Sequence, residues 1–384
     1  MKENENYQRF GVYVHWPFCS SLCPYCDFNS HLQNKFSVQS WGESIIREIE
    51  YFGEKTKSRR VSSIFFGGGT PSLMDPEALK GILAKISRTW TLESETEITL
   101  EANPTSIEIG KFRDFKSLGV NRVSLGIQSL NDSALTFLGR NHSASEGIRA
   151  IKIASKTFSN FSFDLIYARP RQSVNKWKRE LKEGLELGAN HLSLYQLSIE
   201  PGTEFYRRKI NVPDSDAAAN YYKTTQEIME NRGMPAYEIS NHSIPGSECK
   251  HNLLYWEGHD YVGLGPGAHS RLQFGGKIYA IYQIHDPKKW VNSVSKRGHG
   301  TAKNKIISLH ARGEELIMLG LRTPKGIKIS RLERQTNKQI GDFFNPIEFN
   351  NLIKNGFLQN SGGYIRATLS GRMCLNLVLR KLMV

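Results

Sequence analysis

The sequence has few cysteines and no long apolar run, and each shortage argues against a class of protein. Only five cysteines occur in 384 residues, and Cys249 and Cys374 lie far from the others, which argues against a disulfide framework and indicates a reducing compartment. No uninterrupted apolar stretch reaches membrane-spanning length, and the first residues contain no apolar core of a secretion signal. We therefore expect a cytoplasmic protein without a transmembrane segment.

Acidic residues are scarce, most of all in the last fifth of the chain. The formal net charge is +14, and residues 301–384 contain 14 Lys and Arg against 5 Asp and Glu. A basic surface attracts nucleic acid, anionic lipid or an acidic ligand. The charges are dispersed, however, and no helix shows the row of base-reading Arg, Asn or Gln side chains that DNA recognition requires. The pattern therefore favours a solvated basic surface over nucleic-acid binding.

Three of the five cysteines stand close together as Cys19-x3-Cys23-x2-Cys26. Three thiolates within eight residues indicate a site for a soft metal. Zinc completed by His15 or His31 is one interpretation, but no second ligand pair follows at zinc-finger spacing. A four-iron cluster held by only three thiolates keeps one iron open for a ligand, whereas electron-transfer clusters take four cysteines. The spacing therefore favours a reactive [4Fe-4S] cluster.

Apolar runs alternate with amphipathic stretches along the first part of the chain. Strands are expected at Gly11–His15, Val61–Phe66, Glu97–Glu101, Asn121–Ile127, Phe161–Tyr167 and His191–Leu197. Helices are expected at Val38–Phe52, Pro76–Arg88, Ile107–Leu118, Ser145–Ser155, Asn175–Leu187 and Ser215–Asn231. Strands separated by whole helices pair in parallel through right-handed crossovers. The pattern predicts an α/β fold, either a partial (β/α)6 barrel or a doubly wound open sheet.

Polar motifs follow several of these strands, at the end where α/β folds place their sites. Gly67-Gly68-Gly69-Thr70-Pro71 follows the second expected strand, and its glycines let a ligand approach the backbone. Glu101-Ala-Asn103-Pro104 ends the third strand, Gln128 ends the fourth, and Asp164 lies in the fifth. Each residue alone is as consistent with a turn or cap, but together they predict one shared pocket.

The cysteine motif with Tyr25 before its last cysteine, the Gly-Gly-Gly-Thr-Pro turn and the Glu-Ala-Asn-Pro turn together resemble the radical S-adenosylmethionine superfamily. Nearly the whole chain is similar to its coproporphyrinogen-oxidase-like branch. The resemblance implies a radical-SAM barrel in which Cys19, Cys23 and Cys26 hold a [4Fe-4S] cluster whose open iron chelates S-adenosylmethionine. It also implies reductive cleavage of this cofactor to methionine and a 5′-deoxyadenosyl radical.

The same resemblance implies further contacts with S-adenosylmethionine, and it assigns no residue a catalytic role. Gly68, Gly69 and Thr70 would receive the methionine amine. The other implied contacts are Tyr13, Glu101, Gln128, Arg140 and Asp164. One departure from the family pattern follows Tyr167, where relatives commonly carry glycine and this chain has Ala168, at which a left-handed backbone is costly.

Two relatives within the branch need to be separated. Oxygen-independent coproporphyrinogen III dehydrogenases carry a fourth cysteine where this chain has Phe28, and they have a longer segment before the cluster motif than the 18 residues that precede Cys19. Both differences favour the HemW-type haem chaperones, which implies haem as ligand, haem-acceptor proteins as partners and peripheral contact with membrane proteins. The dehydrogenase, or another radical enzyme acting on a tetrapyrrole, is the alternative.

The stretch His251-Asn252-Leu-Leu-Tyr255-Trp256 matches a motif of the HemW-like proteins. The resemblance implies haem contact by His251, Tyr255 and Trp256, since histidine is a common axial ligand and aromatic rings pack on porphyrins. Cys249 is a second candidate ligand. Considered without the family, a single histidine beside two aromatic residues is more often a packing histidine.

The pattern changes after Trp290, so we expect a radical-SAM core with its HemW-like extension over residues 1–290 and a basic HemN-type domain over 291–384. In the second domain we expect a loop at Lys296–Asn304 and a hairpin wing from Gly356 to Leu369. Helices are expected at Leu309–Leu321, Ile347–Asn355 and Gly371–Leu382. This order resembles a winged helix, and a basic winged-helix regulator with a redox-sensing cluster is a third function class.

Overall fold

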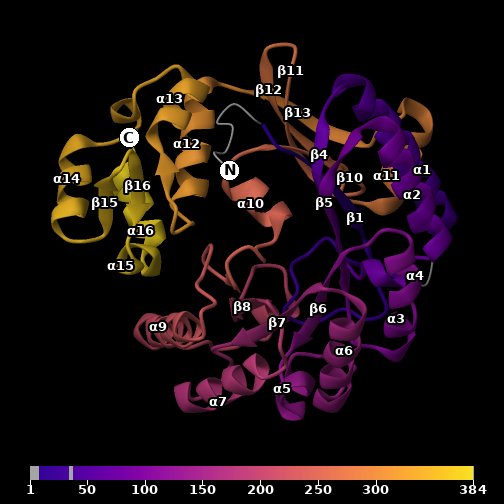
Figure 1. Cartoon of the computed structure of the whole chain (residues 1–384), viewed down its shortest axis with the longest axis horizontal. Coiled ribbons are helices and arrows are strands. Elements are labelled where there is room, and N and C mark those ends of the chain that lie inside the picture. Colours follow the sequence, from indigo (N-terminus) through magenta and orange to yellow (C-terminus); the bar gives the residue numbers. More distant parts are fainter. Residues whose placement is uncertain (1–7, 34–37, 384) are drawn as a thin grey trace.

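A sheet of eleven strands organises most of the computed structural model, which describes residues 8–33 and 38–383 (Figure 1). Six neighbouring strands run parallel in chain order, and all six were predicted. They are β1 (Phe10–Trp16), β4 (Arg60–Gly68), β5 (Thr91–Ala102), β6 (Arg122–Gln128), β7 (Asn160–Tyr167) and β8 (His191–Gln196). The prediction of a partial (β/α)6 barrel is confirmed.

Helices between the parallel strands cover the outer face of the barrel (Figure 1). They are α1 (Val38–Lys55), α2 (Pro76–Thr89), α3 (Ser106–Gly110), α4 (Phe112–Ser117), α5 (Asp132–Phe137), α6 (Ala144–Thr157) and α7 (Val174–Leu185). Helix α6 begins with a reciprocal capping box between Ser143 and Glu146. The helix predicted over Ile107–Leu118 is split into α3 and α4 at Lys111, directly after Gly110, a residue that weakens helices.

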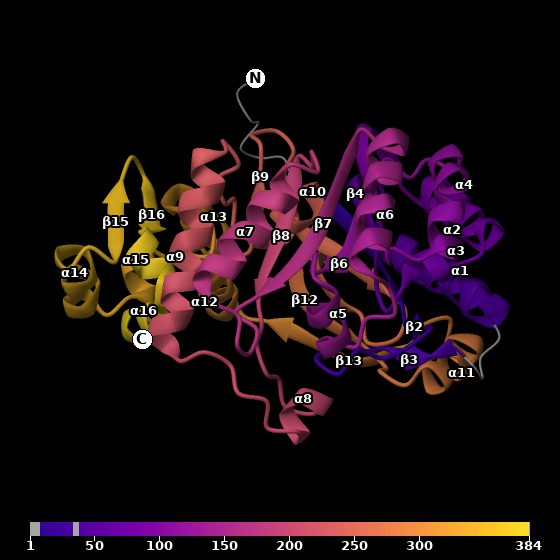
Figure 2. The same cartoon turned by 90° about the horizontal axis from the view of Figure 1, so that it is seen from below.

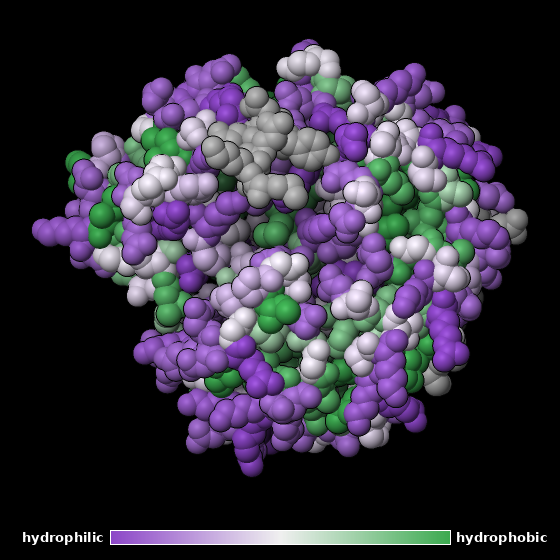
Figure 3. All heavy atoms as spheres, viewed as in Figure 1, coloured by the Kyte–Doolittle hydropathy of each residue, from purple (hydrophilic) through white to green (hydrophobic). Residues whose placement is uncertain are grey.

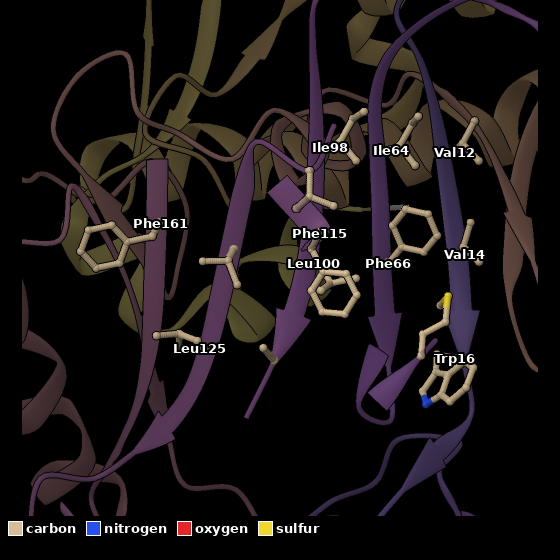
Figure 4. Close-up of a cluster of buried hydrophobic side chains, with 14 of the residues drawn as sticks. Val12, Val14, Trp16, Ile64, Phe66, Ile98, Leu100, Phe115, Leu125 and Phe161 are labelled. Atoms are coloured by element: carbon tan, nitrogen blue, oxygen red, sulfur yellow. The ribbon is translucent and has the colours of Figure 1, made fainter. Parts of the chain in front are cut away.

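Side chains alternate between two environments along each parallel strand. Outward positions pack against the helices as a fully buried apolar core, to which β1 contributes Val12, Val14 and Trp16 and β4 contributes Ile64 and Phe66 (Figure 4). Inward positions are largely polar. They include His15 of β1, Ser63 of β4, Glu97, Thr99 and Glu101 of β5, Arg122 and Ser124 of β6, Ser162 and Asp164 of β7, and His191 and Ser193 of β8. The interior of the barrel is therefore a polar site rather than a second apolar core.

The sheet continues beyond both ends of the parallel set, which the sequence did not predict. Next to β1 lie β10 (Asp260–Leu264), β11 (His269–Phe274), β12 (Lys277–Gln283) and β13 (Thr301–Ile307), of which β10 is parallel to β1 and the rest are antiparallel. Next to β8 lies β9 (Asn241–Ser243). The short strands β2 (Phe18–Cys19) and β3 (His31–Leu32) pair with each other, separately from the main sheet (Figure 2).

Four further helices belong to this part of the chain. They are α8 (Glu204–Arg207), α9 (Ser215–Asn231), α10 (Lys250–Trp256) and α11 (Pro287–Arg297). The loop predicted over Lys296–Asn304 was wrong at both ends, because α11 continues to Arg297 and β13 begins at Thr301. The main sheet thus extends to Ile307, later than the expected domain boundary at residue 290.

The C-terminal domain has its own apolar core, which includes Ile317, Leu332, Phe343 and Val378. It contains α12 (Leu309–Gly320), β14 (Ile327–Lys328), α13 (Ile329–Thr336), α14 (Pro346–Lys354), β15 (Leu358–Ser361), β16 (Tyr364–Ala367), α15 (Leu369–Met373) and α16 (Leu375–Leu382). The predicted hairpin is β15–β16, but the predicted closing helix is broken at Cys374 into α15 and α16.

Short 3-10 turns and surface features complete the fold. The turns are η2 (Pro71–Leu73) and η3 (Ile340–Phe343). On the face seen in Figure 3, hydrophobic side chains show between hydrophilic ones rather than as one continuous patch. Within residues 8–33 and 38–383, no helix is both long and apolar enough to span a bilayer.

Candidate functional site

A cavity of about 400 Å³ opens at the carboxyl ends of the parallel strands. The loop after β2 forms one wall, and residues at or just after the ends of β4 to β8 form the others. The predicted site residues that line it are Cys19, Cys23, Cys26, Gly68, Gly69, Thr70, Glu101, Gln128, Arg140 and Asp164. These residues come from six separate segments of the chain and meet at one place, as expected for a parallel α/β site.

The three cysteines are free thiols, and each is partly exposed to the cavity. The Thr70 hydroxyl lies 3.5 Å from Cys19 Sγ, and Arg140 Nη1 lies 3.2 Å from Cys23 Sγ. Both groups donate hydrogen bonds, and such donors stabilise a thiolate that binds iron. Across the described residues, no three His, Cys, Asp or Glu side chains converge on a single metal ion. The thiolates of a cubane need not converge in this way, because each binds a different iron.

Burial raises the pKa of Cys26 to about 11 and also raises the pKa of Cys19. Without a metal these thiols therefore keep their protons at neutral pH. An iron–sulfur cluster would replace those protons, because metal ligation deprotonates a thiol outright. Three thiols on one loop, two hydrogen-bond donors to their sulfur atoms and an adjoining cavity fit a [4Fe-4S] cluster with one open iron.

Asn29 anchors the loop that carries the cysteines. Its Nδ2 donates to the carbonyl oxygens of Pro266 and His285, both at 2.9 Å, and its own carbonyl oxygen lies 2.9 Å from His15 Nε2. Gly267 has a φ of +80°, and a Cβ there would lie 2.6 Å from Asn29 Nδ2. The extension after β10 therefore holds the cysteine loop in place.

The Gly-Gly-Gly-Thr-Pro turn packs directly on the backbone of β1 and β2. Gly69 N donates to Trp16 O at 2.7 Å, and a Cβ on Gly69 would lie 2.6 Å from Phe18 O. Gly68 N donates to Glu101 Oε2 at 3.2 Å. Because these N–H groups already have acceptors in the chain, the turn would hold an ammonium group through carbonyl oxygens.

Two half-buried carboxylates, Glu101 and Asp164, share the floor of the cavity. Burial, with the charge of Asp164 as a second cause, raises the pKa of Glu101 to about 8. Burial also raises the pKa of Asp164 to about 6. At neutral pH Glu101 thus holds a proton and can donate as well as accept a hydrogen bond, whereas Asp164 is mostly ionised. Such a pair suits a ligand that presents several hydroxyl groups, for example a ribose.

Arg140 connects the cluster loop to the strand ends. Its Nη2 donates to Gly126 O at 2.8 Å and to the side chain of Asn103, while its Nε is buried without a partner. Gln128 has a φ of +68°, and its Oε1 is also buried without a partner. Unpartnered polar atoms in a cavity wall are costly unless a ligand satisfies them.

Sequence reasoning left several lining residues unassigned. Asn103 donates to Thr70 Oγ1 at 3.0 Å and accepts from Arg140, so it joins two predicted contacts. Ser124 and Tyr195 also line the cavity from the inward side of their strands. The polar alternation along β6 and β8 was the signal that would have identified both residues.

Ala168 adopts the left-handed backbone that the sequence marked as costly, with a φ of +56°. The next residue, Arg169, forms a buried ion pair with Glu180 of α7 and donates to Ser129 Oγ at 2.6 Å. Gln172 joins the same carboxylate at 3.1 Å. This network holds the loop after β7 in a conformation that alanine alone disfavours.

Tyr13 and His251 lie below the cavity rather than in its wall. Tyr13 is two residues before His15 on the inward face of β1, its ring stacks on Phe65, and its hydroxyl lies 3.0 Å from His15 Nδ1. His251 belongs to α10, which packs on the start of β1 and β4 and closes the amino-terminal end of the barrel (Figure 1). Neither side chain contributes to the cavity as the structure stands.

Both ring nitrogens of His251 already have partners. Nδ1 lies 2.8 Å from Ser63 Oγ and Nε2 lies 2.8 Å from Tyr255 Oη. The side chain is 1% exposed, and burial lowers its pKa to about 3. Cys249 is buried beside Glu97, and burial raises its pKa to about 12. In this conformation neither group can reach a ligand, whereas Trp256 lines a different cavity.

Two family models match the chain. The first, described as the Radical SAM superfamily, matches residues 13–184, and the second, described as the HemN C-terminal domain, matches residues 307–374. The first match covers the barrel from β1 to the end of α7, and the second covers most of the C-terminal domain.

Several curated proteins are similar over most of the chain. The heme chaperone HemW of Haemophilus influenzae is 33% identical over 375 residues, which cover 96% of this chain and 96% of that protein. HemW of Escherichia coli is 38% identical over 280 residues, 72% of this chain and 74% of that protein. Radical S-adenosyl methionine domain-containing protein 1, mitochondrial, of Danio rerio is 37% identical over 327 residues, 82% of this chain and 73% of that protein.

A solved structure shares the fold across both domains. Coproporphyrinogen III oxidase (HemN) of Escherichia coli superposes with a TM-score of 0.82 at 20% identity and covers 97% of this chain and 89% of that chain. At this identity the match shows the architecture alone.

Proposed function

The chain belongs to the HemW family of radical S-adenosylmethionine proteins, and from this premise we propose that it is a cytoplasmic haem chaperone. It holds a [4Fe-4S] cluster and S-adenosylmethionine, binds haem, and delivers haem to respiratory or other haem-requiring proteins. One observation supports the proposal that the chain binds these cofactors. Three free thiols lie on one loop and face a cavity that is lined by polar residues at the strand ends.

Different residues of the cavity would bind different parts of the cofactors. Cys19, Cys23 and Cys26 would bind the cluster, which when present supplies an electron and an open iron. The carbonyl oxygens of the glycine turn would accept the methionine amine, and Glu101 and Asp164 would bind the ribose hydroxyls. Arg140 and Gln128 also line this cavity, and each has a buried polar atom without a partner, Nε and Oε1 respectively.

Anaerobic reconstitution with iron and sulfide tests the cluster. We expect about four irons per chain and a cubane absorption band, and we expect S-adenosylmethionine to change the electron paramagnetic resonance spectrum of the reduced cluster. Cys26→Ser should lose the band, whereas Cys374→Ser, a change in the C-terminal domain, should keep it. A cubane spectrum that ignores S-adenosylmethionine would contradict the proposal.

Haem titration and transfer test the chaperone activity. The purified protein should develop a Soret band with haem and pass the haem to a haem-free acceptor, such as an apocytochrome. Incubation with coproporphyrinogen III, S-adenosylmethionine and a reductant should yield no decarboxylated product. Efficient conversion of coproporphyrinogen III would instead establish the dehydrogenase alternative; the fold neighbour is named coproporphyrinogen III oxidase.

A further inference from the structure

A second and larger cavity, of about 1010 Å³, lies between the barrel and the C-terminal domain. The barrel side contributes residues before β1 and around α10. The other side includes α12, the loop after it, β14, α13 and the first residue of β16. Helices α10 and α12 are neighbours in this region and contact each other (Figure 1). We name it the interdomain cleft. Ligand cavities commonly measure roughly 300–1,000 Å³, so the cleft has room for a large ligand.

We call the first cavity, which is lined by Cys19, Cys23 and Cys26, the cluster cavity. The interdomain cleft lies far from it. Arg9 precedes β1 and His259 precedes β10, so both mark the amino-terminal ends of these parallel strands, whereas Cys19 follows the carboxyl end of β1. Strand β1 has seven residues, which at 3.3 Å per residue separates the two cavities by about 20 Å. The two cavities are therefore separate sites.

Positive charge dominates the lining of the cleft. Five lining residues are cationic, against two acidic ones, Glu248 and Glu257. The cationic residues are Arg9, Lys325, Lys328, Arg331 and Arg334. Burial lowers the pKa of Arg331; the charge of Glu257 opposes this shift, and the guanidinium groups of Arg312, Arg9 and Arg334 add to it. Glu257 pairs with Arg9 at 3.6 Å and with Lys325 at 3.3 Å. With five cationic and two acidic residues the lining keeps a net positive charge, which favours an anionic ligand.

The rest of the lining is apolar and aromatic. Leu316, Ile327 and Leu332 are buried and form part of the wall. Trp256, Tyr237 and Tyr364 contribute aromatic rings, and the guanidinium of Arg322 lies 5.4 Å from the Trp256 ring. A ligand that fits this lining combines apolar or aromatic surface with anionic groups such as carboxylates.

We infer that the interdomain cleft is the haem site, with the macrocycle against Trp256 and the apolar wall and the two propionates on Arg331 and its cationic neighbours. This inference rests on the proposed haem-chaperone function and gives that function a location. The cluster cavity is less than half as large and carries the residues for another cofactor, so haem has its own site. The same placement brings Trp256, a half-buried residue of the His251–Trp256 stretch that lines the cleft, into contact with haem.

Equilibrium titration of the full-length protein tests this site, with haem and metal-free protoporphyrin IX as probes. Arg331→Gln and Trp256→Leu should each lower the affinity for both probes about tenfold or more. The first loses a charge-assisted hydrogen bond and the second an aromatic contact. Protoporphyrin IX dimethyl ester, which lacks the propionate charges, should bind the wild-type protein much more weakly than the free acid. Arg380→Gln on α16 removes an exposed cation outside the cleft and should leave all affinities within about twofold.

Three outcomes separate this inference from the proposed function. If the wild-type protein binds no haem, the chaperone proposal fails and the site fails with it. If the wild-type protein binds haem and Arg331→Gln and Trp256→Leu bind it with the same affinity, the chaperone proposal stands and only the assignment of haem to the cleft is wrong. Loss of haem binding in Cys26→Ser, with Arg331→Gln unaffected, would place haem at the cluster cavity and overturn the cleft assignment. Urea denaturation of each variant checks that it is folded.

Discussion

Single residues on the inward side of the strands give the barrel its chemistry. Arg122 Nη2 donates to Ser162 Oγ at 2.8 Å, Ser162 donates to Ser124 Oγ at 2.8 Å, and Ser124 reaches Asp164 at 3.5 Å. This chain of hydrogen bonds connects a buried cation to the carboxylate in the cluster cavity, and the Arg122 charge opposes the effect of burial on the pKa of Asp164. The alternation of residue types along the strands thus sets the charge state of the site.

The raised pKa of Glu101 predicts a pH dependence of stability. The folded protein binds a proton on this group up to a pH of about 8, whereas the unfolded chain releases it near 4.5, so the free energy of unfolding falls as pH rises between these values. Glu101→Gln removes this slope. We expect the variant to match the wild type below pH 4.5 and to be more stable above pH 8 in urea denaturation. Parallel curves for the two proteins across this range would contradict the prediction.

The left-handed residue after β7 predicts a stabilising substitution. Ala168 has a φ of +56°, which is strained for alanine and unstrained for glycine. Glycine also increases the conformational entropy of the unfolded chain, which offsets part of the gain in stability. We expect Ala168→Gly to raise the free energy of unfolding by up to about 1 kcal/mol, measured by urea denaturation. Ala150→Gly, inside α6, is the matched control and should lower it by about 1 kcal/mol or more. A loss of stability in Ala168→Gly would show that the backbone strain is absent.

At the scale of elements, α10 acts as a plug at the amino-terminal end of the barrel, and His251 is its buried anchor. His251→Ala removes the partners of Ser63 and Tyr255 and opens a cavity, so we expect a loss of about 3 kcal/mol in the free energy of unfolding. Because the folded pKa is lowered to about 3, the contribution of His251 is complete above about pH 6.5 and shrinks as pH falls toward 3.

Urea denaturation of His251→Ala and the wild type at several pH values checks this prediction. The gap between the two proteins should be widest at neutral pH and should narrow on acidification. A variant as stable as the wild type at neutral pH, but unable to bind haem, would instead support direct ligation by His251. Asn376→Ala, an exposed substitution on α16, serves as the control without a stability change.

Elements that carry a strong period were predictable, and those without one were not. The six parallel strands and most of the helices between them were found because β-branched and aromatic runs alternate with amphipathic helices. Strand β13 was missed because its side chains are mostly exposed and include Lys303 and Lys305. Charged residues protect a sheet edge from pairing, and the same residues make such a strand resemble a loop.

The candidate site was predictable to the extent that it follows strand ends. Cys19, Thr70, Glu101 and Asp164 come from separate segments, yet parallel topology alone places them at one edge. The depth of Tyr13 was not predictable, because it depends on how far each strand extends past its neighbours. The interdomain cleft also lay beyond sequence reasoning, since its two walls come from domains that no local pattern brings together.

At the scale of the whole molecule, the two cavities should act independently on their ligands. Mutations far apart and without shared partners usually add within about 0.5 kcal/mol. With cavities about 20 Å apart, Arg331→Gln should leave the affinity of the cluster-loaded protein for S-adenosylmethionine within about twofold of the wild type. Isothermal titration calorimetry under anaerobic conditions measures this affinity. A larger change would reveal coupling between the C-terminal domain and the barrel.

The attachment of the cysteine loop through Asn29 has a consequence for biosynthesis. The ribosome adds Pro266 and His285, whose carbonyl groups hold Asn29, more than 230 residues after the three cysteines. At a synthesis rate of roughly 5–20 residues per second, the carbonyl groups that bind Asn29 are made on the order of ten seconds to a minute after the cysteine segment. The proposed cluster would therefore meet a shaped acceptor only once translation has passed this point, and a prematurely terminated chain would expose its thiols to solvent.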